Sequence, residues 1–153
     1  MARTAVAVGP GHHRKLAADL FNATWDLIEK KGRTRDEELA MIHMAHASRH
    51  HWAQVGTPTN LAVGEWQVSH VYAVLRRAEP AMYHARAALR VCREGRVGGF
   101  ALAYAYEALA RASAVAAKWK ERDRYVRLGE RAAQGIEETE DREQVLRDLA
   151  RIP

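Results

Sequence analysis

The chain of 153 residues has little cysteine, proline or glycine, and each shortage excludes something. Its one cysteine, Cys92, rules out an internal disulfide and zinc sites built on paired cysteines. No apolar run approaches the ~20 residues of a membrane span. The short run at residues 5–8 lies below the ~7–15 residues of a signal-peptide core. Only 4 prolines and 10 glycines interrupt an alanine-rich sequence, which favours long helices. We therefore expect an all-α, cytoplasmic protein without a membrane segment.

The chain also has no segment in which positive or negative charges are concentrated. Lysine and arginine number 24 against 19 aspartate and glutamate residues, a net charge of +5. No run of five or six like charges occurs, and interspersed charges are typical of solvated helical surfaces. No predicted helix carries an uninterrupted basic and amide-rich face suited to the major groove of DNA. Nucleic-acid binding is therefore disfavoured and remains only a third interpretation, kept open by the basic balance.

The spacing of apolar residues predicts seven helices after a flexible N-terminal tail of residues 1–14. A capping-box pattern at Thr34 and Glu37 starts the second helix, and Asp141 is expected to cap the last one. Because the turns are short, the helices should pair as three antiparallel hairpins with a C-terminal capping helix. Residues 15–153 then form one domain. The predicted helices cover about 15–31, 35–55, 58–77, 80–93, 100–117, 120–134 and 141–152.

Residues 71–78 are similar to residues 105–112 at an offset of 34, the tetratricopeptide period. Tyr72, Ala81, Ala85 and Ala88 also fall at spacings similar to the signature of that family. The middle of the chain thus resembles the tetratricopeptide-repeat family, and the whole chain resembles small bacterial helical-repeat proteins of no settled function. The resemblance implies a short superhelix of hairpins with a concave groove for a peptide, a partner protein or a small ligand. It leaves the oligomeric state open, a homo-oligomer included.

The resemblance also implies which side chains line the groove, since the first helix of each pair faces it. Trp66 and His70 should then face inward from the helix over 58–77. Tyr106 is their expected counterpart on the first helix of the following pair, over 100–117. The alternative is that Trp66 and Tyr106 pack between repeats. Glu107 is spaced to form an ordinary surface pair with Arg111, and it becomes a candidate ligand or general base only if it faces the histidines. The expected ligand-binding residues are Trp66, His70, Tyr106, Glu65 and Glu107.

Three histidines, His43, His46 and His50, share one face of the helix predicted for residues 35–55. The i, i+4 pair of His46 and His50 is spaced to bind one divalent transition metal, with His43 one turn away. Further ligands could come from Glu65, His70 or His84. This pattern supports an alternative function, a metal-dependent or histidine-based enzyme on the same scaffold. Packing roles and a pH-sensitive interface are the other interpretations.

The same helix is apolar on two sides, one carrying Leu39 and the other carrying Met41 and Ala45. We therefore expect it to be sandwiched within the stack, with its histidines partly buried. The residue after His46 is Ala47, where the zinc-protease motif requires glutamate as its general base. Hydrolysis by that motif is not supported, and the sequence does not decide whether the chain catalyses any reaction.

Overall fold

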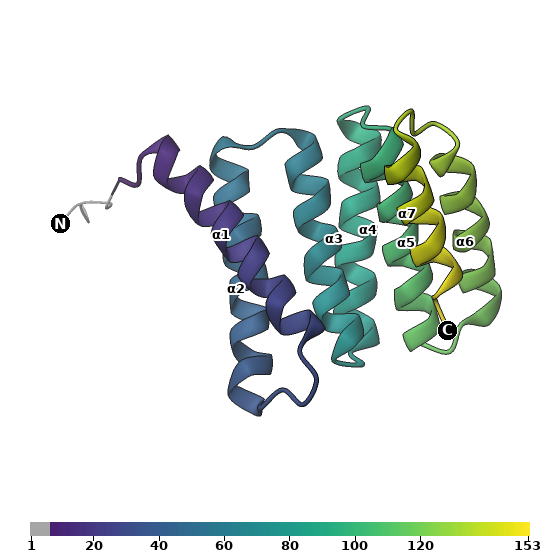
Figure 1. Cartoon of the computed structure of the whole chain (residues 1–153), viewed down its shortest axis with the longest axis horizontal. Coiled ribbons are helices and arrows are strands. Elements are labelled where there is room, and N and C mark those ends of the chain that lie inside the picture. The colour runs from purple at the N-terminus through teal and green to yellow at the C-terminus, as the bar shows by residue number, and fades with distance from the viewer. Residues whose placement is uncertain (1–6) are drawn as a thin grey trace.

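The structure is a computed structural model that describes residues 7–153, and these residues form α-helices with no strand among them (Figure 1). The all-α class is thus confirmed. None of the helices in this described range is long and apolar enough to cross a membrane. The helices are α1 (Pro10–Glu29), α2 (Arg35–Val55), α3 (Pro58–Val74), α4 (Ala78–Glu94), α5 (Gly99–Val115), α6 (Trp119–Ala133) and α7 (Thr139–Ala150).

The helices pack as three antiparallel hairpins, α1 with α2, α3 with α4, and α5 with α6. Figure 1 shows the hairpins side by side, with α1 crossing α2 at a slant and α7 lying over α5. The odd-numbered helices also contact one another, because α3 packs against α1 and α5, and α5 packs against α7. One side of the stack is therefore built from α1, α3, α5 and α7.

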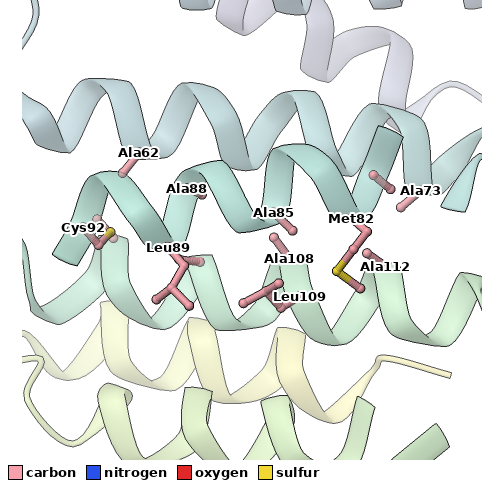
Figure 2. Close-up of a cluster of buried hydrophobic side chains, with 13 residues drawn as sticks. Ala62, Ala73, Met82, Ala85, Ala88, Leu89, Cys92, Ala108, Leu109 and Ala112 are labelled. Carbon is pink, nitrogen blue, oxygen red and sulfur yellow. The ribbon is translucent and has the colours of Figure 1, made fainter. Parts of the chain in front are cut away.

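The main core lies between α3, α4 and α5 and is made largely of alanine (Figure 2). Small side chains let helix backbones approach closely, and the larger Met82, Leu89 and Leu109 fill the spaces between them. This packing explains why an alanine-rich chain with few large apolar residues still forms a dense interior. The buried alanines of this core are Ala62, Ala73, Ala81, Ala85, Ala88, Ala101, Ala105, Ala108 and Ala112.

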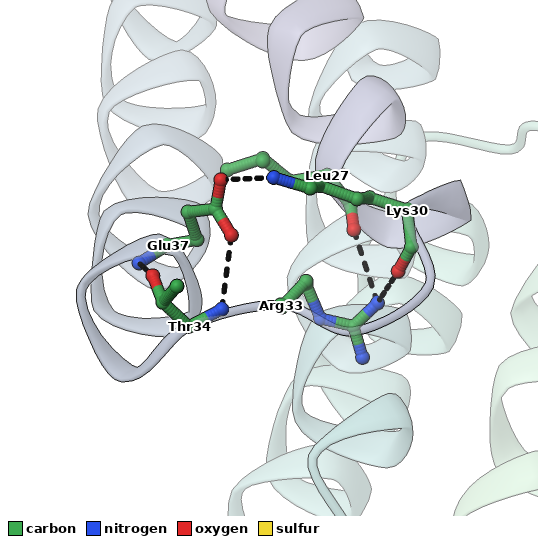
Figure 3. A network of polar contacts seen from close by, with 5 residues as sticks. All are labelled: Leu27, Lys30, Arg33, Thr34 and Glu37. Atoms are coloured by element: carbon green, nitrogen blue, oxygen red, sulfur yellow. Dashed lines mark hydrogen bonds and ion pairs between the residues drawn. The ribbon is translucent and has the colours of Figure 1, made fainter.

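The predicted capping box at the start of α2 is present (Figure 3). Thr34 Oγ1 accepts from the Glu37 backbone N–H at 3.2 Å, and Glu37 Oε2 accepts from the Thr34 N–H at 2.9 Å. In the same turn Arg33 Nη1 donates to the carbonyl oxygens of Leu27 at 3.0 Å and Lys30 at 2.8 Å. These bonds satisfy backbone groups at the end of α1 and the start of α2, which fixes the first hairpin turn.

Two predicted helix starts are wrong. Helix α1 begins at Pro10 rather than near Lys15, because proline is well suited to the first turn and Gly9 serves as N-cap. The tail therefore does not include residues 10–14, and residues 1–6 of the predicted tail lie outside the described residues. Asp141 does not cap α7: Glu138 is the N-cap, and Asp141 lies in the first helical turn, where the helix dipole favours an acidic side chain.

The distance along the chain between corresponding helix starts is longer than the offset between the two similar sequence segments. Helix α3 begins at Pro58 and α5 begins at Gly99, so these two positions correspond when the hairpins are matched by their starts. The same register matches Arg76 with Ala117, and both adopt positive φ just after α3 and α5. In this structural register, the α5 counterpart of Trp66 is Glu107 rather than Tyr106.

Ala117 carries a backbone strain that glycine would relieve. Its φ is 57°, in the left-handed region, and the Lys118 N–H donates to the Ser113 carbonyl oxygen at 2.9 Å to close the turn. We expect Ala117→Gly to raise the free energy of unfolding by about 0.5–1 kcal/mol, measured by urea titration. Ala116→Gly is the control, since Ala116 has φ −80° and gains nothing from glycine. Loss of stability in Ala117→Gly would contradict this account of the turn.

Candidate functional site

Helices α1, α3, α5 and α7 line a cavity of about 510 Å³, which we call the groove. This volume lies in the range of small-molecule binding sites. Each of the four helices contributes side chains to it, and the lining combines apolar and polar groups. The lining residues are Phe21, Trp25, Glu29, Val63, Trp66, His70, Phe100, Tyr104, Glu107, Arg111, Gln144 and Asp148.

Five of these residues form a continuous series of aromatic rings across α1, α3 and α5. The series, called the aromatic row below, runs Phe21, Trp25, Trp66, Tyr104, Phe100, with successive ring centroids 6.4, 5.3, 4.7 and 4.6 Å apart. These spacings and the tilts between rings are those of favourable aromatic pairs. The His70 ring lies beside the row, 5.1 Å from Trp25 and 5.9 Å from Trp66. The groove therefore has an extended aromatic wall.

Glu107 is 1% exposed and organises the polar side of the groove. Its Oε2 accepts from Trp66 Nε1 at 2.8 Å, and its Oε1 accepts from Arg111 Nε at 2.8 Å and also from Arg111 Nη2. The surface-pair interpretation of Glu107 and Arg111 is thus wrong, because the glutamate is buried. The pair instead holds the indole of Trp66 in one orientation.

A second polar link joins α5 to α7 at the edge of the groove. The Tyr104 hydroxyl donates to Asp148 Oδ2 at 2.7 Å. Burial raises the pKa of Tyr104 well above its ordinary range, and the neighbouring Asp148 carboxylate adds to the effect. Tyr104 therefore remains a protonated donor, and Asp148 is held at the groove as a carboxylate acceptor.

His70 is neutral in this environment. Burial lowers its pKa to about 3, and the positive charge of Arg111 acts in the same direction. Its Nδ1 is buried and has no hydrogen-bond partner within residues 7–153. A neutral imidazole can donate through one ring nitrogen and accept through the other, so His70 supplies the groove with an uncharged polar group.

The structure brings together three of the five predicted ligand-binding residues. Trp66, His70 and Glu107 line the groove, whereas Tyr106 and Glu65 do not. Tyr106 lies between α4 and α6, where it lines a different pocket. The structural register explains this outcome, because it places Glu107 and Arg111 of α5 beside Trp66 and His70 of α3.

Glu65 faces α2 and α4 instead of the groove. Its Oε1 accepts from Arg49 Nε at 2.8 Å, and its Oε2 lies 2.7 Å from His84 Nδ1. Burial alone would raise the pKa of Glu65, but the hydrogen bond from His84 and the charge of Arg49 hold it below its ordinary value. Glu65 is thus an ionised carboxylate that links three helices.

The predicted histidine cluster on α2 does not converge. His43 and His50 are exposed, while His46 is half-buried with its Nε2 2.9 Å from the Tyr72 hydroxyl. The His50 ring packs against His51 on the same helix, whereas the His46 ring lies 5.2 Å from the ring of His84 on α4. Within residues 7–153, no group of three histidine, cysteine, aspartate or glutamate side chains is arranged to hold a metal ion.

The expected sandwiching of α2 is also wrong. Met41, Ala45 and Ser48 are buried against neighbouring helices, but Leu39 on the histidine face is 55% exposed. Helix α2 packs along α1 and α3, and α4 approaches it through the His84 ring beside His46, which leaves Leu39 facing solvent. This leaves His43 and His50 exposed.

Phe100, Tyr104 and Arg111 were not among the predicted ligand-binding residues, although they share a simple helical spacing with Glu107, which was among them. Phe100, Tyr104, Glu107 and Arg111 recur at intervals of three or four residues and so lie on one face of α5. Tyr104 from this face and Trp25 from α1 both lie in the aromatic row. A helix face that combines aromatic and charged residues in this way could have indicated a binding surface on α5. No sequence pattern pointed to Asp148, because only the packing of α7 on α5 brings it to the groove.

A larger cavity of about 680 Å³ lies along α4 and the turn between α5 and α6. Its lining includes Met82, Tyr83 and Arg86, and it contains none of the hydrogen-bonded polar network found in the groove. A site built for one ligand combines apolar surface with a few fixed polar groups. The groove meets that description, and the larger cavity does not.

Fold and groove together define a class of protein: a stack of antiparallel helical hairpins in which one layer of helices lines a ligand-sized groove. Comparison of the chain with models of protein families, with curated proteins and with solved structures gave no match.

Proposed function

We propose that the chain is a tetratricopeptide-like binding module that takes a small ligand or a short peptide segment in the groove. The observation that carries the proposal is the convergence of five aromatic rings, the His70 imidazole and the Glu107–Arg111 ion pair on one cavity of about 510 Å³. The arrangement of hairpins, with α1, α3 and α5 on the groove side, agrees with the resemblance to that family.

Each part of the groove has a role in binding. The aromatic row provides a broad apolar surface, which is the main source of affinity in small-molecule sites. The polar groups supply orientation, because Glu107 fixes the Trp66 indole and Asp148 fixes the Tyr104 hydroxyl. All of these side chains project from helices, so the site is formed before a ligand arrives and little ordering opposes binding.

A fragment screen followed by amide chemical shifts in NMR tests the proposal. We expect fragments to perturb amides of α1, α3, α5 and α7, and Trp25→Ala to weaken their binding about tenfold through loss of one aromatic face. Trp119→Ala is the matched control, since Trp119 is 51% exposed and lies outside the groove. Fragments that bind only along α4, or that bind Trp25→Ala as tightly as the unmodified protein, would overturn the proposal.

A further inference from the structure

We propose that the groove recognises a small organic cation, an alkylated or quaternary ammonium compound. This inference rests on the proposed function and specifies its ligand. The feature behind it is the combination of an aromatic row with carboxylates that outnumber the cationic side chains.

The lining of the groove is acidic although the whole chain is basic. Glu29, Glu107 and Asp148 contribute three carboxylates, whereas Arg111 is the one arginine or lysine among the lining residues. The net charge of the chain is +5, so this excess of acid is a local property of the groove. A cavity lined with one sign of charge concentrates ligands of the opposite sign.

Arg111 does not offset the two remaining carboxylates, because Glu107 already binds it through two nitrogens. His70 contributes no charge, since burial keeps its pKa far below neutrality. The ion pairs found within residues 7–153 include neither Asp148 nor Glu29. A bound cation would compensate the Asp148 carboxylate, which is half-buried and receives the Tyr104 hydroxyl on one oxygen.

The aromatic row determines which kind of cation fits. Indole and phenol rings attract a cation placed over their faces, and tryptophan does so most strongly. The half-buried Trp25 and Trp66 lie 5.3 Å apart in the same lining as the carboxylates, with the buried Tyr104 packed against Trp66, so one ligand can contact indole rings and acid at once. An alkylated ammonium group matches this wall, because its methyl groups are apolar while its charge is spread over them. A metal ion would gain little from the rings.

The test compares ligands of different charge by isothermal titration calorimetry on the full chain. Choline and its uncharged isostere 3,3-dimethyl-1-butanol form one pair, and benzyltrimethylammonium and benzenesulfonate form a second pair of opposite charge. We expect choline to bind about tenfold more tightly than the neutral alcohol, and benzyltrimethylammonium to bind where benzenesulfonate does not.

Charge-neutralising variants then locate the interaction. Asp148→Asn keeps an acceptor for the Tyr104 hydroxyl, so we expect choline to bind about tenfold more weakly while 3,3-dimethyl-1-butanol is unaffected. Glu29→Gln, at an exposed position of the groove, is a second variant that should weaken choline less and cannot disturb the core. Glu140→Gln is the matched control on α7, exposed and outside the groove.

The outcomes separate the two proposals. Equal binding of choline and the alcohol, stronger binding of benzenesulfonate, or unchanged choline affinity in both groove variants would overturn the cation inference. The groove would then still be a binding site for a neutral or anionic ligand. Failure of all four probes to bind at roughly 10 mM would overturn the cation inference, and the fragment screen described above would then decide separately whether the groove binds a ligand.

Discussion

Replacing Glu107 by alanine is expected to lower the free energy of unfolding by about 3 kcal/mol, measured by urea titration. The carboxylate is 1% exposed, and it accepts bonds from both Trp66 and Arg111. Alanine would leave the indole N–H without its acceptor and the Arg111 guanidinium, 23% exposed, without its counter-charge. Leaving one member of a buried pair unpaired costs more than the pair itself contributes, and this is the source of the large effect.

Two further variants separate the buried pair from ordinary surface charge. Glu107→Gln removes the charge and leaves one acceptor oxygen in place of two, so either Trp66 or Arg111 loses its acceptor, and an intermediate loss of about 2 kcal/mol is expected. Glu143→Ala removes the partner of Arg147 in a pair whose members are 60% and 59% exposed, and its effect should stay within about 0.5 kcal/mol. Equal stability of Glu107→Ala and Glu143→Ala would show that the Glu107 pair does not hold the groove together.

The architecture was predictable because helices have a local signature. The capping box at Thr34 and the proline after Thr57 define helix starts through neighbouring residues, and both are present in the structure. The turns after α3 and α5 were predicted only to within a few residues. Positive φ at Arg76 and Ala117 ends these helices, and neither arginine nor alanine indicates such a conformation in a sequence.

The groove was only partly predictable, because its register depends on how whole helices pack. Alanine-rich segments match one another at several offsets, and a shift of one position exchanges Glu107 for Tyr106 as the counterpart of Trp66. Packing selects the register that matches the start of α3 with the start of α5, which places Glu107 in that position. Similarly, Trp25 had no local feature to separate it from core residues, and only contact between α1 and α3 brings it beside Trp66.

The histidines show why burial is hard to predict for a helix with two apolar sides. The sequence offers α2 two faces to bury, and the stack covers the one that carries Met41 and Ala45. The histidine that does lie in the groove, His70, is on a different helix. Of the three predicted histidines of α2, His46 alone lies beside a histidine of another helix, His84 of α4, and no group arranged to hold a metal ion is present in the described part of the chain. A histidine-based enzyme on α2 stays a prediction.

Acidification is expected to destabilise the protein through His70, with about 2 kcal/mol lost between pH 6.5 and pH 4.5. The ordinary histidine pKa of 6.5 applies to the unfolded chain, whereas burial and Arg111 lower the pKa to about 3 in the folded state. Between these values the unfolded chain binds a proton that the folded chain does not. The stability that neutral His70 contributes is therefore fully present above pH 6.5 and is lost as the pH falls toward 3.

The measurement is the free energy of unfolding as a function of pH for the unmodified protein and for His70→Phe and His70→Gln. Both variants lack the titrating group, so their stability should fall about 2 kcal/mol less over the same interval. The pKa values of His46 and His51 are also lowered, mainly through burial. The lowered pKa of Glu65 makes the free energy of unfolding depend on pH at lower pH as well. Because these groups are unchanged in the variants, the difference between the curves isolates His70. Parallel curves would mean that His70 takes up a proton in the folded state, and the groove would then carry an additional positive charge in mild acid.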